Sequence, residues 1–368
     1  MSFASIAFLI FFPIVIIVTA VLERHFSPRV KELFLLAASY FFYGYWDWRF
    51  CFLLLFVTVS SYLSAKYSTK KPAFIAGIVV PLIVLVFFKY FNFFVGSVAA
   101  IIGKDIGVLK IILPVGISFY TFQALSYVID VHRNNIPVEK DFIKLAFYIS
   151  FFPQLVAGPI VRAADFLPQL RQNRKVTWDN LKWGVQVFTF GLFKKVVLAD
   201  HISVFVDDVY SKPAAFHWLT IVFATLTYSL QIYLDFSGYS DMAIGCAKCL
   251  GYDFNKNFDI PYISQNVTEF WRRWHISLST WLKEYVYIPL GGNRKGTVRT
   301  HLNLLMTMLI GGLWHGANWT FVLWGGINEL ALCFDKFIHS KKRAGFLGGG
   351  TIPTDVFVYF VYMDILQV

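Results

Sequence analysis

Apolar residues follow one another in long runs along this chain. The period-two alternation of a membrane β-barrel does not occur. A membrane-spanning helix needs roughly 20 apolar residues. Runs that approach or exceed this length lie at 3–22, 33–64, 73–91, 111–129, 184–206 and 217–236. The run 33–64 is interrupted at 43–49, where Tyr and Trp predict the tip of a tight helical hairpin. The pattern predicts an all-α polytopic membrane protein, folded as a single integral-membrane domain over residues 1–368.

Three further segments do not fit a simple span. Residues 142–161 are apolar but contain Pro153, Gly158 and Pro159, which predicts a broken or re-entrant element. Residues 239–251 form a separate, less apolar segment rich in small residues. Residues 252–301 are too polar to span. Within them, 269–288 shows the pattern of a basic amphipathic helix that lies at the cytoplasmic interface.

The segment 302–335 is apolar, and both of its flanks are basic. If both flanks are cytoplasmic, the segment crosses twice or dips and returns. Two full crossings need about 40 residues plus a turn. We therefore expect short, broken helix around Gly311-Gly312 and Gly325-Gly326, with His315 on a backbone break inside the membrane.

Composition supports a membrane protein. Only 15% of residues are charged, against roughly 25% in soluble chains, and the mean hydropathy is +0.59. The net charge of +11 is explained by the lysines and arginines that cytoplasmic loops accumulate, so nucleic-acid binding is not expected. The four cysteines make no disulfide framework. Cys246 and Cys249 lack the strand-then-helix context of a redox pair, and no metal site is predicted.

Two histidines carry the candidate chemistry. His315 lies in Gly311-Gly312-Leu313-Trp314-His315-Gly316-Ala317-Asn318-Trp319, and His275 lies in an aromatic, basic stretch. In an apolar tunnel desolvation disfavours the imidazolium, so a histidine there stays neutral and can accept a proton from an attacking hydroxyl. Asn318, the Trp314 indole or backbone amides can stabilise an oxyanion. The alternative is a structural His315 that is hydrogen-bonded between helices.

Long motifs carry a family resemblance. The run FWRRWHISLSTWLKEYVYIPLGGN (270–293), the later LWHGANW (313–319) and YLDFSGYSD (233–241) resemble the membrane-bound O-acyltransferase family. The similarity is greatest to members that acetylate alginate, other exopolysaccharides or peptidoglycan. Weaker agreement extends over nearly the whole chain.

The resemblance implies a helical fold in which broken and interfacial helices surround a central funnel. It implies a cytoplasmic acetyl-CoA donor, no permanently bound cofactor, and an extracytoplasmic polysaccharide or peptidoglycan acceptor. A periplasmic partner and the bacterial inner membrane also follow from it.

The resemblance further implies roles for individual residues. His315 matches the catalytic histidine, and His275 matches a second motif position that is commonly Asn or His. Asp235, Tyr239 and Asp241 would support the site, or else make plain helix–helix hydrogen bonds. Arg272 and Arg273 would meet the donor's phosphates, unless they only face lipid headgroups.

The chain departs from the family pattern in two places. Asn328 stands where relatives tend to have a further histidine, and an amide cannot replace it as a base. The segment 352–368 is barely long enough to cross a membrane, so the last spans of relatives are expected to be absent. The short C-terminus leaves open a catalytically inactive scaffold. A transporter or flippase, whose broken helices would bind substrate at the midplane, is the other alternative.

Overall fold

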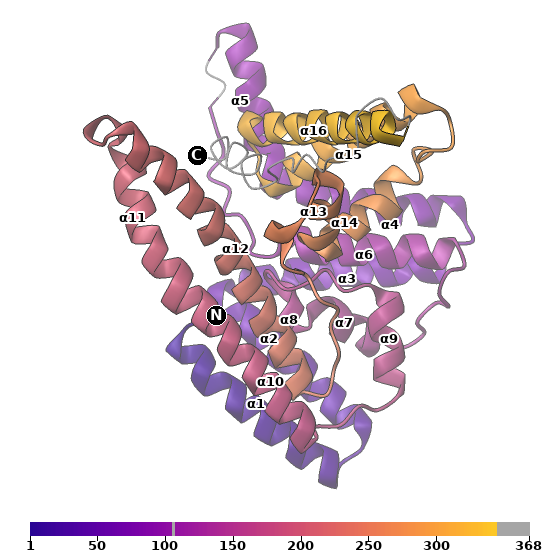
Figure 1. The fold of residues 1–368 in the computed structure, drawn as a ribbon. Coiled ribbons are helices and arrows are strands. Elements are labelled where there is room, and N and C mark those ends of the chain that lie inside the picture. The colour runs from indigo at the N-terminus through magenta and orange to yellow at the C-terminus, as the bar shows by residue number, and fades with distance from the viewer. Residues whose placement is uncertain (105–106, 344–368) are drawn as a thin grey trace. The chain divides into compact units, whose positions relative to one another are not determined.

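All regular secondary structure in the part of the chain described by the computed structural model is helical (Figure 1). The description covers residues 1–104 and 107–343, with side chains to Lys336. Four helical stretches are long and apolar enough to cross a membrane: α1 (Ile6–His25), α3 (Arg49–Lys66), the run Lys71–Ile102, and α12 (Trp218–Cys249). The predicted all-α polytopic membrane class is confirmed.

Contacts between residues divide the chain into two compact units. The first unit comprises Met1–Phe193 and Gly238–Asn255, and the second comprises Lys194–Ser237 and the described residues from Lys256 onward. The long helix α12 contributes to both units: its residues up to Ser237 belong to the second unit, and those from Gly238 onward belong to the first.

The first unit opens with three long helices. After α1 come α2 (Pro28–Asp47) and α3, separated only by Trp48, as the predicted hairpin tip requires. The ring of Phe8 on α1 packs 5.9 Å from that of Phe42 and 6.0 Å from that of Phe188, measured between centroids. Such aromatic contacts each bury a large apolar area, so they help to hold α1 against its neighbours.

Next, α4 (Lys71–Leu85) passes through the π-helical turn η1 (Val86–Tyr90) into α5 (Phe91–Ile102). Helix α6 (Ile117–His132) packs against α3 and α4 and is buried along most of its length. The predicted span 111–129 was wrong at its start, because residues 111–116 are not helical. Pro114 and Gly116, which has φ +74°, precede the helix and set its first turn.

The predicted broken element at 142–161 is confirmed. It consists of α7 (Phe142–Ser150) and the single turn α8 (Phe152–Leu155), and non-helical chain precedes α9 (Ala163–Arg171). Backbone groups that lack a helical partner here bond to side chains inside the protein. The Tyr148 hydroxyl donates to the Val161 carbonyl at 2.9 Å, and the Ser39 hydroxyl accepts from the Phe152 amide at 3.2 Å. Irregular backbone is tolerated among apolar helices when it is satisfied in this way.

A long helical stretch follows. Helix α10 (Trp178–Leu192) continues through the π-helical η2 (Phe193–Ala199) into α11 (Asp200–Ser211), and the short η3 (Pro213–Ala215) precedes α12. The prediction of separate segments at 217–236 and 239–251 was wrong, because α12 runs through both. The polar residues between them lower the hydropathy, but none is a proline, and Gly238 alone does not stop a helix.

The second unit also contains η4 (Pro261–Ile263), α13 (Val267–Arg273), α14 (Ile276–Leu282), the π-helical η5 (Lys283–Tyr287), α15 (Thr297–His315) and α16 (Trp319–Arg343). The single amphipathic helix predicted at 269–288 was wrong. Trp274 and His275 leave helical geometry and divide it into α13 and α14.

The predicted helix breaks at Gly311-Gly312 and Gly325-Gly326 were also wrong, because α15 and α16 run through them. These glycines instead let two helices approach closely. A Cβ on Gly312 would lie 2.2 Å from the Phe321 carbonyl oxygen, and one on Gly325 would lie 2.4 Å from that of Met308. The break falls at residues 316–318, directly after His315.

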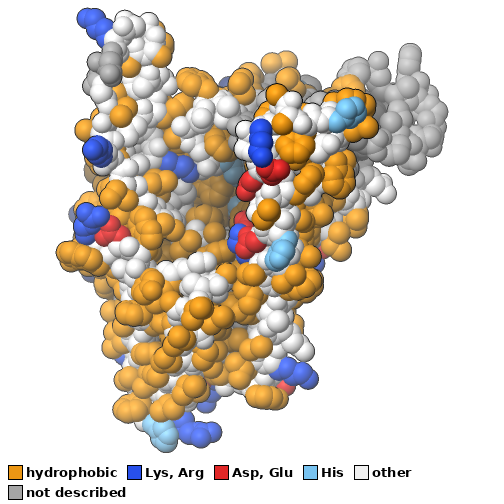
Figure 2. All heavy atoms as spheres, turned by 90° about the vertical axis from the view of Figure 1, so that its left-hand side faces the viewer, with side chains coloured by type: hydrophobic (Ala, Val, Ile, Leu, Met, Phe, Trp, Pro, Cys, Tyr) orange, Lys and Arg blue, Asp and Glu red, His pale blue; other side chains and the backbone are white. Residues whose placement is uncertain are grey.

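Large apolar side chains remain exposed on the outside of many helices, including Ile6, Ile10, Ile14 and Ile17 of α1. Figure 2 shows one face on which apolar side chains predominate over charged ones. Exposed apolar surface of this extent marks contact with lipid or another apolar partner. It agrees with the spans found along the chain.

Candidate active site

The break between α13 and α14 places His275. This residue adopts left-handed backbone geometry with φ 42°, a conformation in which histidine and asparagine are enriched among non-glycine residues. It forms the N-cap of α14, and its carbonyl accepts from the Ser279 amide at 3.0 Å. The backbone turn directs the side chain inward, where His275 is only 1% exposed.

Asn257 determines the tautomer of His275. The Asn257 Oδ1 accepts hydrogen bonds from the Ser277 amide at 3.2 Å and the Ser277 hydroxyl at 2.9 Å, and it lies 3.1 Å from His275 Nδ1. A backbone amide can only donate, so the atom facing it is the oxygen and not the amide nitrogen. His275 Nδ1 must therefore carry the proton, and Nε2 holds the lone pair.

The Nε2 of His275 is buried, and no hydrogen-bond partner reaches it from the described residues. Burial, with the neighbouring His315 as a smaller cause, lowers the pKa of His275 well below its ordinary value. The ring is therefore neutral near pH 7, with an acceptor atom available to a hydroxyl group or another donor.

Trp314 connects the two histidines. Its ring lies edge-on to both, with centroid distances of 5.7 Å to His275 and 5.1 Å to His315. Phe236 closes another side of His275 at 4.7 Å, and Trp324 packs 5.0 Å from His315. The structure thus brings both predicted histidines into one aromatic cluster within the second unit.

His315 is the last residue of α15 and lines a cavity of about 300 Å³. Most of the lining is apolar, supplied by α14, α15 and α16 and including Leu278, Leu282, Leu304, Met308, Trp324 and Leu332. A largely apolar cavity with a few polar groups is the usual form of a small-molecule site.

Three exposed cations line the same cavity: Arg272, Lys283 and Lys336. None of them makes an ion pair with another described residue. Arg273 differs, because its guanidinium bonds to Glu269 at 2.9 Å and it does not line the cavity. Of the two arginines predicted from the sequence, Arg272 therefore lines the cavity, whereas Arg273 forms an ion pair within α13.

The three motif residues of α12 lie apart from this cavity. Asp235, in the second unit, is half-exposed and forms an ion pair with Lys195. Tyr239 and Asp241 belong to the first unit. Asp241 lies where α12 packs closely on Gly191 of α10. Within the second unit, the part of the motif that contacts the histidines is Phe236, which sequence reasoning had not selected.

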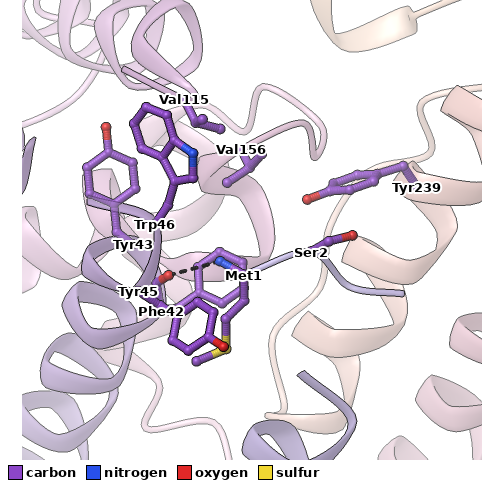
Figure 3. A pocket seen from close by; sticks show the side chains of 9 residues that line it. All are labelled: Met1, Ser2, Phe42, Tyr43, Tyr45, Trp46, Val115, Val156 and Tyr239. Carbon is purple, nitrogen blue, oxygen red and sulfur yellow. Dashed lines mark hydrogen bonds between the residues drawn. The ribbon is translucent and has the colours of Figure 1, made fainter. Parts of the chain in front are cut away.

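Tyr239 lines a separate cavity of about 520 Å³ in the first unit (Figure 3). Its ring stacks on Phe3 at 4.7 Å between centroids. The other lining residues are Met1, Ser2, Phe42, Tyr43, Tyr45, Trp46, Val115 and Val156. In this cavity the amino terminus of Met1 donates to the Phe42 carbonyl, as the dashed line in Figure 3 marks.

The two predicted asparagines have local backbone partners. Asn318 is exposed, and its Oδ1 accepts from the Thr320 amide at 3.1 Å at the start of α16. Asn328 is fully buried, and its Nδ2 donates to the Trp324 carbonyl at 2.8 Å. Asn328 thereby helps to fix the α16 turn that carries Trp324 against His315.

Sequence reasoning missed Asn257, Lys283 and Lys336. Asn257 lies in an irregular polar stretch and is 18 residues from His275, so no helical or strand periodicity relates the two. Lys283 and Lys336 appeared as ordinary interfacial charges. Only the packing of α14 and η5 on the α15–α16 pair brings them to one cavity.

Comparisons with known proteins agree with one another, and together they cover most of the chain. Residues 136–348 match the model of the membrane-bound O-acyltransferase family. A probable alginate O-acetylase of Pseudomonas putida is 44% identical over 325 residues, which are 84% of this chain and 66% of that protein. The corresponding protein of Pseudomonas aeruginosa is 45% identical over 327 residues, 84% of this chain and 62% of that protein.

A peptidoglycan O-acetyltransferase of Helicobacter pylori is 36% identical over 354 residues, which are 87% of this chain and 67% of that protein. The chain thus spans about two thirds, or slightly less, of the length of these curated relatives. The predicted absence of the last spans concerns 352–368, which lie outside the described residues.

Proposed function

Because this chain belongs to the membrane-bound O-acyltransferase family, we propose that it transfers an acyl group from a coenzyme A thioester to a hydroxyl group. The observation that carries the proposal is the position of His315. Its imidazole lines an apolar cavity that three exposed cations also line.

In the proposed reaction His315 is the general base. The acceptor oxygen attacks the thioester carbonyl carbon while His315 takes the hydroxyl proton. The new C–O ester bond forms, the C–S bond breaks, and the proton passes from the imidazolium to the leaving thiolate. His315 is the last residue of α15 and lines the cavity, so its imidazole can contact substrate there without a change in the helix.

His275 is proposed to orient a reacting hydroxyl or thioester group. Its Nδ1 proton is held by Asn257, so Nε2 can act only as an acceptor while the ring is neutral. Trp314 packs against both rings, and a fixed relative position of the two imidazoles is what proximity catalysis requires.

The donor is proposed to be acetyl-CoA that enters from the cytoplasm. A coenzyme A thioester combines an uncharged acyl end with a diphosphate and a further phosphate. Apolar lining beside Arg272, Lys283 and Lys336 suits both ends of such a molecule. The cations would hold the phosphates while the acyl end approaches His315.

The acceptor is proposed to be an extracytoplasmic polysaccharide of the alginate type, reached through a periplasmic partner at the bacterial inner membrane. Support comes from the two relatives at 44% and 45% identity that are described as probable alginate O-acetylases. The relative at 36% identity is described as acting on peptidoglycan, which makes peptidoglycan the competing acceptor.

The test compares His315→Ala with His25→Ala, an exposed histidine in the first unit. Membranes containing each full-length variant, together with the periplasmic fraction of the host, would receive isotopically labelled acetyl-CoA and either polyuronate or peptidoglycan strands. His315→Ala should lower acyl transfer by roughly 10²–10⁴-fold, while His25→Ala retains it. Undiminished transfer by inserted, folded His315→Ala protein would refute the assignment of the base, and exclusive labelling of peptidoglycan would refute the assigned acceptor.

A further inference from the structure

A second polar cluster joins α15 to α16, away from the histidine pair. His301 lies in the first turns of α15, whereas Glu329 and Cys333 lie one turn apart on α16 and share a face. At about 1.5 Å per residue, His301 lies roughly 21 Å along α15 from His315. The cluster is therefore distinct from the proposed catalytic residues.

Three ligand-type atoms converge in this cluster. The Cys333 Sγ lies 3.0 Å from His301 Nδ1 and 3.0 Å from Glu329 Oε1, and Nδ1 lies 3.6 Å from Oε1. Metal–ligand bonds of about 2.0–2.3 Å around a tetrahedral ion place the ligand atoms roughly 3.3–3.8 Å apart. The observed atoms need to separate by only about half an ångström to match that geometry.

The burial of Glu329 is the second observation. Glu329 is 3% exposed, and its Oε2 has no hydrogen-bond partner among the described residues. A buried carboxylate is normally paired, hydrogen-bonded or bound to a metal. A simple network, in which the Cys333 thiol donates to Oε1 and Lys336 supplies a nearby charge, leaves Oε2 unsatisfied.

Charge and donor type both suit a borderline-soft dication. One thiolate and one carboxylate together balance a charge of +2, and a neutral imidazole completes the set. Thiolate with imidazole favours zinc over magnesium or calcium, which prefer oxygen donors. His301 and Cys333 are partly exposed, so an ion and a water ligand have access.

We propose that His301, Glu329 and Cys333 bind a divalent ion of the zinc class, with water as the fourth ligand. The ion would join α15 to α16, the two helices that hold His315 and line its cavity. Metal binding of this kind stabilises the folded pair without taking part in acyl transfer. The sequence did not reveal the site because His301 lies far from the other two residues along the chain.

The first experiment is metal analysis of purified full-length protein after dialysis against buffered zinc. The wild type should retain one ion per chain, and Cys333→Ser, His301→Gln and Glu329→Gln should each weaken zinc binding by at least about tenfold. Cys51→Ser is the matched control, since Cys51 is also a partly exposed thiol, and it should bind like the wild type. Equal zinc content in all variants would show adventitious binding and overturn the proposal.

A second experiment needs no substitution, in case the variants do not fold. Maleimide labelling of wild-type protein would be followed at Cys333 and Cys51 with zinc and with a chelator. Zinc should slow the labelling of Cys333 by at least about tenfold and leave Cys51 unchanged. A Cys333 labelling rate that is the same in zinc and in chelator would refute the site, whatever the acyltransferase assays show.

Discussion

The cavity lined by Tyr239 and the cavity lined by His315 differ in chemistry more than in size. The first-unit cavity is larger, about 520 Å³ against about 300 Å³. Its described lining has tyrosines, a tryptophan and the Met1 amino group, but no histidine, lysine, arginine or carboxylate side chain. The smaller cavity of the second unit combines His315 with three exposed cations on an apolar wall. The feature that distinguishes the candidate reactive site is therefore a histidine beside several cations, and not the cavity volume.

The largest effect after loss of His315 is expected at Asn257, which has no counterpart in the first cavity. Asn257→Ala removes the acceptor that holds the Nδ1 proton of His275, so the ring can adopt the other tautomer. Acyl transfer should fall by roughly 10–100-fold, the size typical for residues that orient a reactive imidazole. Initial rates with saturating acetyl-CoA would measure it.

Asn257→Asp distinguishes orientation from mere packing. The carboxylate keeps the acceptor but stabilises the imidazolium, so the pKa of His275 should rise. Acyl transfer by this variant should then decline at a higher pH than in the wild type, in which only the protonation of His315 limits the rate as pH falls. A pH profile identical to that of the wild type would count against a neutral His275 in the reaction.

The neighbouring arginines sharpen the comparison within one helix. Arg272→Gln removes a cation from the cavity and should raise the KM for acetyl-CoA by about tenfold, with a smaller change in kcat. Arg273→Gln removes the ion pair with Glu269 instead, and it should leave KM unchanged while lowering thermal stability slightly. Equal KM values for the two variants would contradict phosphate binding at this cavity.

Burial of His275 also predicts a pH-dependent stability of the second unit. The unfolded chain binds a proton on this residue below about pH 6.5, the ordinary value, whereas the folded chain does not until a much lower pH. The folded state therefore loses stability as pH falls below that value. Thermal unfolding between pH 5 and 7 should show a melting temperature that rises with pH, and this slope should be smaller in His275→Asn.

The smallest effect is expected in the first cavity. The hydroxyl of Tyr239 is buried without a hydrogen-bond partner among the described residues, so Tyr239→Phe loses no bond seen there. The free energy of unfolding should change by less than about 1 kcal/mol, and acyl transfer should stay within about twofold of the wild type. A large loss of activity would assign chemistry to this cavity after all.

Much of the fold followed from hydropathy, because the length of an apolar run limits what can cross a membrane. The broken element at 142–161 was predictable from Pro153, Gly158 and Pro159. The glycines near His315 misled the prediction, since the same residue type serves a helix break and a close helix crossing. Gly312 and Gly325 allow a close helix crossing, and only three-dimensional packing distinguishes this role from a helix break.

Site residues that lie within one sequence motif were predictable, whereas those brought together from distant segments were not. His275, Trp314 and His315 stood in long motifs and lie in one cluster. Asn257 and Lys336 contribute through contacts between separate elements, for which no spacing rule exists. Asp235 attracted attention as a carboxylate in apolar sequence, yet its partner is Lys195 on the preceding helical stretch.

The left-handed backbone at His275 restricts which amino acids can stand there. Asparagine adopts this conformation readily, whereas valine or isoleucine would meet a steric penalty whatever their polarity. Replacing this histidine by asparagine should thus preserve the kink between α13 and α14, although asparagine cannot take up a proton as imidazole does. Interchange at this motif position is permitted first by stereochemistry and only afterwards by reactivity.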